Sequence, residues 1–224
     1  MGNPSPKAVR KNKILQAALK IFAEKGFLEA TIAEISKAAE VSEATVYEYF
    51  KTKEDLLFAI PEEITEEAFL EWKKMLPYFR GTEARLRAIV QAHMNLYQNN
   101  PHYSALVMLQ LKSNRNFLKT RAYEIIRDIA RTLLGYIEDG IADGTFNKET
   151  NPYLVRSMIL GTIEHLCIRW HLQGEPTNLV ELVDPLLDAI LDGIKMKRAS
   201  RGLSLNLNFS EMGLKLESSG ESEE

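Results

Sequence analysis

The chain has 224 residues, of which 45% are hydrophobic and 26% charged, a composition typical of a globular protein with one large domain or two smaller ones. Its 12 Gly and 8 Pro are too few for the turns of an all-β sandwich. The longest uncharged stretches, such as Tyr103–Leu111, are far shorter than the roughly 20 residues that span a bilayer. The single cysteine, Cys167, cannot form an internal disulfide. Composition therefore predicts an all-α, cytoplasmic protein without a membrane segment.

The charge distribution is more informative than the net charge of −3, which taken alone argues against a nucleic-acid partner. Residues 1–25 carry six cations and one anion, a local balance of +5, whereas residues 62–224 carry 19 cations and 23 anions, a balance of −4. A basic end on an acidic body favours a polyanion as the partner of that end, with a solvated basic arm as the alternative.

The first 50 residues show the pattern of three short helices. Apolar residues recur at helical spacing from Val9, and Lys25-Gly26 is a typical helix end. Thr31 and Glu34 form a capping box before a second helix, and Ser42 caps a third helix that ends at Tyr49. This is the layout of a tri-helical helix-turn-helix domain, which we place at residues 9–53, after a mobile arm at residues 1–8.

The sequence from Thr31 to Leu57 resembles the DNA-binding domain of TetR/AcrR-family repressors. The most specific part is Thr-Val-Tyr-x-Tyr-Phe-x-x-Lys-Glu-x-Leu, from Thr45 to Leu56, and the resemblance covers roughly residues 10–58. It implies a repressor that binds palindromic double-stranded operator DNA as a homodimer and responds to a small molecule. A helical carrier or a protein-interaction adaptor without specific DNA binding remains the alternative.

The third helix presents short polar side chains that fit a major groove. Glu43 can accept a hydrogen bond from a cytosine amino group, while Ala44 and Thr45 can contact a thymine methyl group. We expect Tyr47 and Tyr49 to reach phosphates, and the family resemblance implies the same for Thr31. The predicted DNA-binding residues are Thr31, Ser42, Glu43, Ala44, Thr45, Tyr47, Tyr49 and Lys53, the last because it opens the next helix, where free N–H groups favour anions. Glu40 stands where the family often has Gly in a left-handed turn, and Glu can adopt that conformation at modest cost.

The remaining chain, residues 54–198, reads as a helical bundle for effector binding and dimerisation. A long helix runs from Lys53 toward Tyr78 with Pro61 inside it, where we expect a kink. Thr82 is the predicted cap of the next helix, which ends near Asn99. Further helices are predicted at Tyr103–Lys112, Asn116–Asp143, Tyr153–Gln173 and Leu179–Lys197. For residues 199–224 we expect a disordered acidic tail, with a small strand from the alternation of Leu203 to Phe209 as the alternative.

The helix at Tyr153–Gln173 has two apolar stripes, and only one can pack inward. A symmetric contact with a second copy can cover the other stripe. The predicted dimer residues are Met158, Gly161, Thr162, His165, Arg169, Leu186 and Ile190.

The Met and aromatic content of the bundle points to an apolar effector. The stretch from Gly161 to Val183 loosely resembles fatty-acid-responsive members of the family, which bind acyl-CoA; a drug-like or aromatic effector is the alternative. The residues expected to line the pocket are Trp72, Val90, His93, Met94, Tyr97, Tyr103, Val107, Ile163 and Trp170, with Leu86, Met108 and Ile125 beside them, although each of them also fits a plain core.

The sequence carries no signature of catalysis and no complete metal-ligand set. Cys167 and His171 have the spacing of a metal pair, but no third ligand completes it. The apolar neighbours of Cys167 argue against a reactive thiol. Gly-rich phosphate loops and nucleophile elbows are also missing from the sequence. We therefore expect no cofactor and no enzymatic activity.

Overall fold

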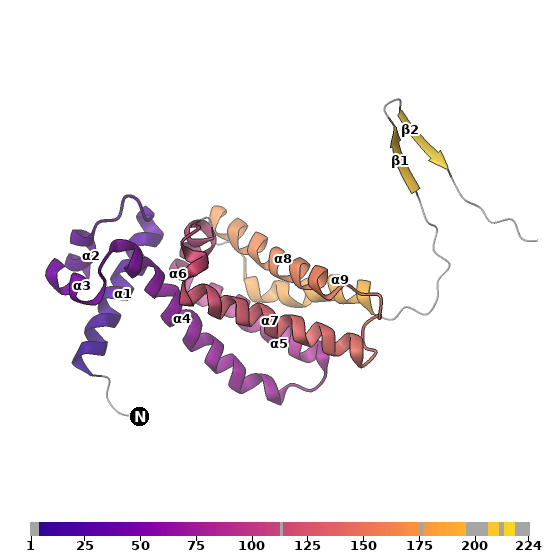
Figure 1. Cartoon of the computed structure of the whole chain (residues 1–224), viewed down its shortest axis with the longest axis horizontal. Helices are drawn as coiled ribbons and strands as arrows, with labels where there is room; N and C mark the ends of the chain where they lie inside the picture. The colour runs from indigo at the N-terminus through magenta and orange to yellow at the C-terminus, as the bar shows by residue number, and fades with distance from the viewer. Residues whose placement is uncertain (1–4, 113, 175–176, 196–205, 211–212, 218–224) are drawn as a thin grey trace, which may run out of the picture.

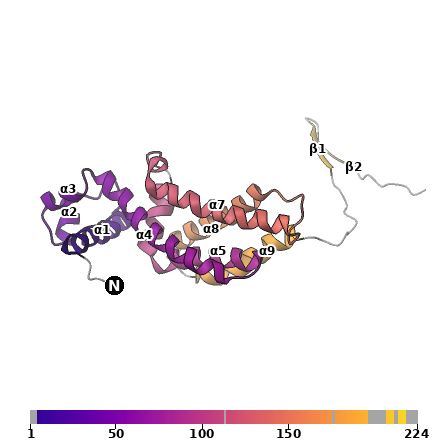
Figure 2. The same cartoon turned by 60° about the horizontal axis from the view of Figure 1, so that its bottom comes forward.

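The computed structural model describes residues 5–112, 114–174, 177–195, 206–210 and 213–217. The protein is all-α in its two main parts, as the sequence predicts: a small helical head at one end and a larger helical body at the other (Figures 1 and 2). Helix α4 belongs to both parts, because its first turns pack in the head and its last turns lie along the body (Figure 1).

The head contains three helices, α1 (Pro6–Lys25), α2 (Ile32–Ala38) and α3 (Glu43–Tyr49). Their buried faces meet in a core that includes Phe22, Ile35 and Val46. Ser5 caps α1, and its hydroxyl accepts a hydrogen bond from the N–H of Ala8 at 3.2 Å. Helix α1 therefore begins at Pro6, three residues earlier than predicted, and residues 6–8 form its first turn rather than part of a mobile arm. Pro suits this position because its missing N–H would have no partner there.

The turn between α2 and α3 contains a left-handed residue, as the sequence suggested. Glu40 has a φ of 57°, and no other residue except glycine has a positive φ within the described segments. The side chain of Glu40 lies 3.4 Å from the ammonium group of Lys13 on α1. The turn is therefore built without glycine, at the modest steric cost of a left-handed Glu.

Helix α4 runs without interruption from Lys53 to Met75 and continues into a short 3-10 turn, η1 (Leu76–Tyr78). Thr52 and Asp55 form a capping box at its start. Pro61 is buried inside the helix, where it removes one backbone hydrogen bond. The boundary predicted between residues 53 and 54 thus falls within the first turn of a continuous helix.

The first helices of the body differ in detail from the prediction. Helix α5 is Thr82–Asn99, but Gly81, with φ of 85°, is its cap, and Thr82 is its first residue; the predicted Thr82 cap is wrong. The Thr82 hydroxyl instead donates to the carboxylate of Asp143 at 3.3 Å. Helix α6 (Pro101–Leu106) leads directly into a π-helical turn, η2 (Val107–Leu111), a form that occurs often at functional sites.

The predicted helix over residues 116–143 is divided. A 3-10 turn, η3 (Phe117–Lys119), comes first, and α7 then covers Arg121–Ala142. Thr120 separates them because its backbone is extended and its hydroxyl caps α7 through the N–H of Tyr123. The Thr cap therefore prevails over the apolar periodicity on either side of it.

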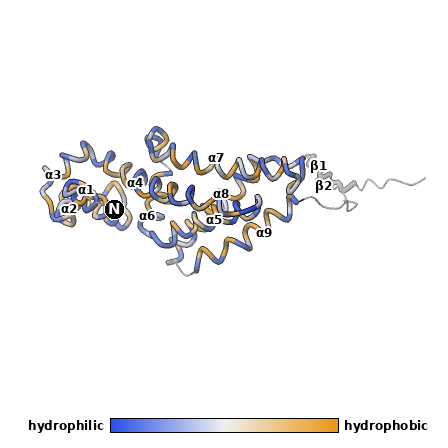
Figure 3. Tube along the Cα trace, turned by 90° about the horizontal axis from the view of Figure 1, so that it is seen from below, coloured by the Kyte–Doolittle hydropathy of each residue, from blue (hydrophilic) through white to orange (hydrophobic). Residues whose placement is uncertain are grey.

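The last helices are α8 (Pro152–Leu172), η4 (Leu179–Leu182) and α9 (Val183–Ile194). The helix predicted at Leu179–Lys197 is thus divided into η4 and α9, and α9 ends at Ile194. The last two residues of the predicted helix, 196 and 197, lie outside the described residues. Apolar and polar positions alternate along the body helices (Figure 3), and their apolar faces form one core with the head. On the surface, Arg87 of α5 forms ion pairs with Asp184 and Asp188 of α9.

Part of the C-terminal region forms an antiparallel hairpin rather than the disordered tail that we expected. Its strands are β1 (Asn206–Ser210) and β2 (Gly213–Glu217), with Asn206 paired to Glu217 and Ser210 to Gly213. The alternating pattern considered as the alternative is the one that matches β1. The rest of the predicted tail lies outside the described residues.

Candidate functional site

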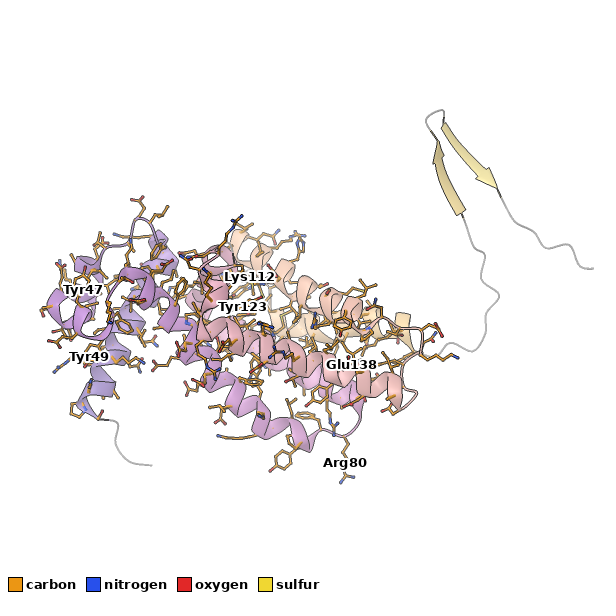
Figure 4. The ribbon with its side chains drawn as sticks, in the orientation of Figure 1. Tyr47, Tyr49, Arg80, Lys112, Tyr123 and Glu138 are labelled. Atoms are coloured by element: carbon orange, nitrogen blue, oxygen red, sulfur yellow. The ribbon has the colours of Figure 1, made fainter. Side chains whose placement is uncertain are left out.

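The third helix of the head presents its outer face to solvent. Ser42, Glu43, Ala44 and Glu48 are exposed, and Tyr47 keeps half of its surface exposed. Figure 4 shows Tyr47 at the outer end of the head, away from the body. Val46, on the opposite face, is fully buried and anchors α3. The helix can therefore enter a groove with its polar face while its apolar face stays in the core.

The start of α3 is rigid because Ser42 makes two local hydrogen bonds. Its hydroxyl accepts from the N–H of Thr45 at 3.1 Å and shares a second bond of 2.9 Å with the Thr45 hydroxyl. The first turn of a recognition helix lies nearest the base edges. Ser42 and Thr45 therefore hold this turn, and the side chains on either side of Thr45 remain free to meet DNA.

The side chains of Tyr49 and Lys53 have partners that the sequence did not predict. The Tyr49 hydroxyl donates to the backbone carbonyl of Lys7 at 3.2 Å. The Lys53 ammonium donates to the carbonyls of Leu28 and Ala30 at 3.3 and 2.8 Å and lies 4.6 Å from the ring centre of Phe27. These contacts fix α1 and the loop before α2 to the rest of the head. The ammonium of Lys53 is thus used inside the head, but its third donor leaves the contact with a phosphate as a prediction.

Thr31 caps α2 at an exposed position. Its hydroxyl lies 3.1 Å from the Glu34 carboxylate, and Glu34 also pairs with Lys25. The hydrogen bond from Lys25 and those from Thr31 lower the pKa of Glu34, while the same Glu34 raises the pKa of Lys25. The free N–H groups at the start of α2 remain an anion-favouring end, with Thr31 beside them.

The interior of the body holds a chain of aromatic side chains from α4, α5 and α6. Trp72 packs against His93 at 5.8 Å between ring centres, His93 against Tyr97 at 4.8 Å, and Tyr97 stacks on Tyr103 at 6.1 Å. His93 Nε2 and the Tyr97 hydroxyl share a hydrogen bond of 3.0 Å, and the Tyr103 hydroxyl is bonded to Thr65. The structure thus brings together four of the predicted effector residues.

Burial controls the protonation of this cluster. It lowers the pKa of His93 to about 4, with a smaller effect from the charge of Lys112, and raises the pKa of Tyr103 to about 12. It also raises the pKa of Cys167 to about 12, so this thiol is unreactive, as its apolar neighbours indicated. His171 shares a hydrogen bond of 2.9 Å with Ser104. The cluster is therefore neutral at pH 7.

The other predicted effector residues form a packed core. Trp170 donates its indole N–H to the carbonyl of Thr177, seven residues later in the chain, at 2.8 Å. Four more of the predicted effector residues are almost completely buried by other side chains, namely Val90, Met94, Val107 and Ile163. A ligand in this interior must displace packed side chains.

An open cavity of about 660 Å³ lies beside the interior, between α4, η1, α5 and α7. Sequence reasoning missed its lining residues, which are Phe69, Lys73, Leu76, Pro77, Arg85, Asp128, Thr132 and Tyr136. The spacing of Phe69, Lys73 and Leu76 at one helical face was the available signal.

The predicted dimer residues of α8 lie on its outer face. Gly161, His165 and Arg169 are exposed, Thr162 is half-buried, and Met158 keeps 44% of its surface exposed beside the exposed Tyr153 and Leu154. On α9, Leu186 is half-buried, but Ile190 is only 6% exposed and belongs to the core of its own chain. Ile190 is therefore removed from the predicted interface because it lies beneath the face.

Gln110 is a further residue that the sequence did not single out. From the π-helical turn it accepts a hydrogen bond from the N–H of Phe27 at 2.9 Å and donates to the carbonyl of Phe22 at 2.6 Å. Phe22 lies near the end of α1 and Phe27 follows it, so Gln110 connects the body to this end of the head by two hydrogen bonds. Lys112, labelled in Figure 4, follows this turn and pairs with Glu164 of α8.

Comparison with known proteins decides the family. Residues 14–60 match the model described as "Bacterial regulatory proteins, tetR family", and residues 69–193 match "YsiA-like protein, C-terminal region". The chain belongs to the TetR family. Bacillus subtilis (strain 168) has a similar "Fatty acid metabolism regulator protein", 26% identical over 83% of this chain and 95% of that protein. The "HTH-type transcriptional repressor KstR2" of Mycolicibacterium smegmatis is 22% identical over 88% of this chain and 97% of that protein.

Solved structures agree with this assignment. FadR from Bacillus subtilis in complex with stearoyl-CoA has a TM-score of 0.76 at 26% identity, over 82% of this chain and 98% of that one. FadR from Bacillus halodurans has a TM-score of 0.77 at 25% identity, over 88% of this chain and all of that one (100%). The protein is thus a ligand-responsive transcriptional regulator that binds operator DNA as a dimer, and it is not an enzyme. In the described part of the chain, no helix is both long and apolar enough to cross a membrane.

Proposed function

We propose that this TetR-family regulator is a cytoplasmic repressor whose operator affinity falls when a long-chain acyl-CoA binds to the body. The main support for this proposal is that α3 exposes a polar face on the head, and that α4 joins the head directly to the body. Similarity to a FadR structure that contains stearoyl-CoA supports the effector class.

DNA is read by the first turns of α3 in this proposal. Glu43, Ala44 and Tyr47 contact the operator directly, while Ser42 and Thr45 hold the turn that presents them. Thr31 and the N–H groups at the start of α2 take a phosphate. The two carboxylates of α3, Glu43 and Glu48, weaken nonspecific attraction to the backbone, so base contacts carry more of the specificity.

The dimer forms through the outer face of α8 and the adjoining surface of α9. The exposed apolar side chains Tyr153, Leu154 and Met158 support this assignment, since a partner copy would remove them from water. Met158→Asp should shift the protein from dimer to monomer in sedimentation velocity. Leu118→Asp, a change at a 53%-exposed leucine of η3 and outside both α8 and α9, is the matched control.

The function is tested by selecting duplexes from a random DNA pool and then titrating the selected site in gel shifts. A palindromic consensus, a negative dependence of affinity on salt, and release by palmitoyl-CoA are expected. A carrier or an adaptor would select no consensus sequence. Selection of a palindrome without any response to palmitoyl-CoA would overturn the proposed effector but leave the DNA-binding function intact.

A further inference from the structure

The open cavity beside α4 combines an apolar wall with two cations. Phe69, Leu76, Pro77 and the ring of Tyr136 supply the wall, and Lys73 and Arg85 supply the charges. Its volume of about 660 Å³ lies within the range of roughly 300–1,000 Å³ found for small-molecule sites. A cavity of this chemistry suits an amphiphile with an apolar chain and a negative end.

Arg85 is held in place by groups that leave its outer nitrogens available. Its Nε donates to the carbonyl of Phe79 at 3.2 Å, and its guanidinium lies 5.6 Å from the ring centre of Tyr136. Its terminal nitrogens make no ion pair with any carboxylate in the part of the chain that the structure covers. Because the guanidinium is already oriented, an anion that binds it loses little side-chain entropy.

The remaining charges leave the cavity positive. Lys73 comes from the last turn of α4 and is exposed. The lining carboxylate, Asp128, is paired with Arg131 at 2.6 Å, outside the lining. The next lysine, Lys74, is bonded to Glu71 at 2.6 Å and does not line the cavity. An incoming anion therefore meets two uncompensated cations from different helices, α4 and α5.

We propose that this cavity binds the anionic end of the effector between Lys73 and Arg85, with the adjoining part of the ligand, the acyl chain of a fatty acid or the pantetheine arm of a coenzyme A thioester, against Phe69, Leu76 and Tyr136. The inference rests on the proposed function and deepens it by locating the site. The anion is a carboxylate or a phosphate, according to whether the ligand is a free fatty acid or a coenzyme A thioester. The site differs from the packed aromatic cluster that the sequence indicated.

The test compares the double variant Lys73→Gln/Arg85→Gln with Lys74→Gln, which removes the same kind of charge one residue away. Binding of palmitoyl-CoA, palmitate and coenzyme A alone is measured by isothermal titration calorimetry, with the lipids kept below micelle formation. We expect the double variant to bind palmitoyl-CoA at least tenfold more weakly, about 1.4 kcal/mol, and Lys74→Gln to bind within twofold of the original protein. Weakening of palmitate as well assigns the carboxylate as the anion; weakening of palmitoyl-CoA alone assigns the phosphates.

A second variant tests the cavity by volume. Thr132→Phe places a ring in the cavity and should also weaken palmitoyl-CoA binding, while operator binding without ligand and the melting temperature stay unchanged. Equal affinities for the double variant and the original protein would overturn this site, even if palmitoyl-CoA still releases the operator. An original protein that binds none of the three probes would overturn the proposed effector and this site together.

Discussion

Replacing Lys53 with Met separates a structural role of this residue from the phosphate contact that the sequence suggested. Met keeps most of the side-chain stem and removes the ammonium group, which donates at 2.8 Å to Ala30 and 3.3 Å to Leu28 and lies 4.6 Å from the Phe27 ring centre. Hydrogen bonds from charged groups contribute about 1.5–3 kcal/mol each, and an exposed cation–π contact about 0.5–1 kcal/mol. Because Lys53 is partly exposed and one bond is long, we expect a total loss of about 2 kcal/mol.

The assay is thermal unfolding, followed by operator titration below the transition. For a chain of this size, a loss of about 2 kcal/mol lowers the melting temperature by roughly 4–8 °C. Lys51→Met is the matched control, since Lys51 is exposed and has no ion pair or hydrogen bond among those seen in the described segments. An unchanged melting temperature together with a more than tenfold loss of operator affinity would refute the structural role and support the phosphate contact.

Three further outcomes follow from the geometry. Tyr47→Ala should weaken operator binding by about 1–3 kcal/mol in gel shifts without changing stability, and unchanged binding would remove Tyr47 from the interface. Gly140→Ala should lower stability by about 1–3 kcal/mol in urea, because its Cβ would lie 2.5 Å from the Phe146 ring, whereas Gly135→Ala on the same helix meets nothing within 4 Å and should stabilise. His93 has a pKa of about 4 in the folded protein, below its value of 6.5 in the unfolded chain. As the pH decreases from 6.5 to 4, the unfolded chain therefore binds a proton that the folded protein does not, and the free energy of unfolding decreases. Stability should be about 2 kcal/mol lower at pH 5 than at pH 7.5, and His93→Phe should remove that part of the pH dependence; an equal loss in the variant would count against it.

Much of the head could be predicted from the sequence because its signals are local. Thr31 and Glu34 cap α2 across three residues, Ser42 caps α3 in the same way, and both motifs occur in the structure as expected. The side chain of Lys53 could not be placed by such reasoning, because its partners precede it by 23 and 25 residues and are backbone carbonyls. The sequence shows which residues are charged, but which carbonyl groups accept hydrogen bonds from them depends on how the loop before α2 folds.

The body was less predictable because apolar spacing reports burial and not the shape of empty space. The residues chosen for the effector site, such as Met94 and Tyr103, are indeed buried, and for that reason they fill the interior. The cavity is lined jointly by residues of α4, η1, α5 and α7, so the sequence of no single element specifies it. The boundary at Thr82 failed for a related reason: the cap is Gly81, whose φ of 85° depends on the path of the loop.

Helix α4 makes a connection between the cavity and the DNA-reading head that needs no intermediate element. Lys53 holds the loop before α2 at one end of the helix, and Lys73 lines the cavity 20 residues later, about 30 Å along a straight helix. An effector changes operator affinity only to the extent that it binds two arrangements of the protein unequally, so a hundredfold release requires about 2.7 kcal/mol of coupling. The affinity of a ligand that contacts both Lys73 of α4 and Arg85 of α5 depends on the distance between these two helices. We expect a displacement of α4 that this ligand favours to reach the head as a change in the bend of α4, because Pro61, which lies between Lys73 and Lys53, removes one backbone hydrogen bond and lowers the cost of bending there.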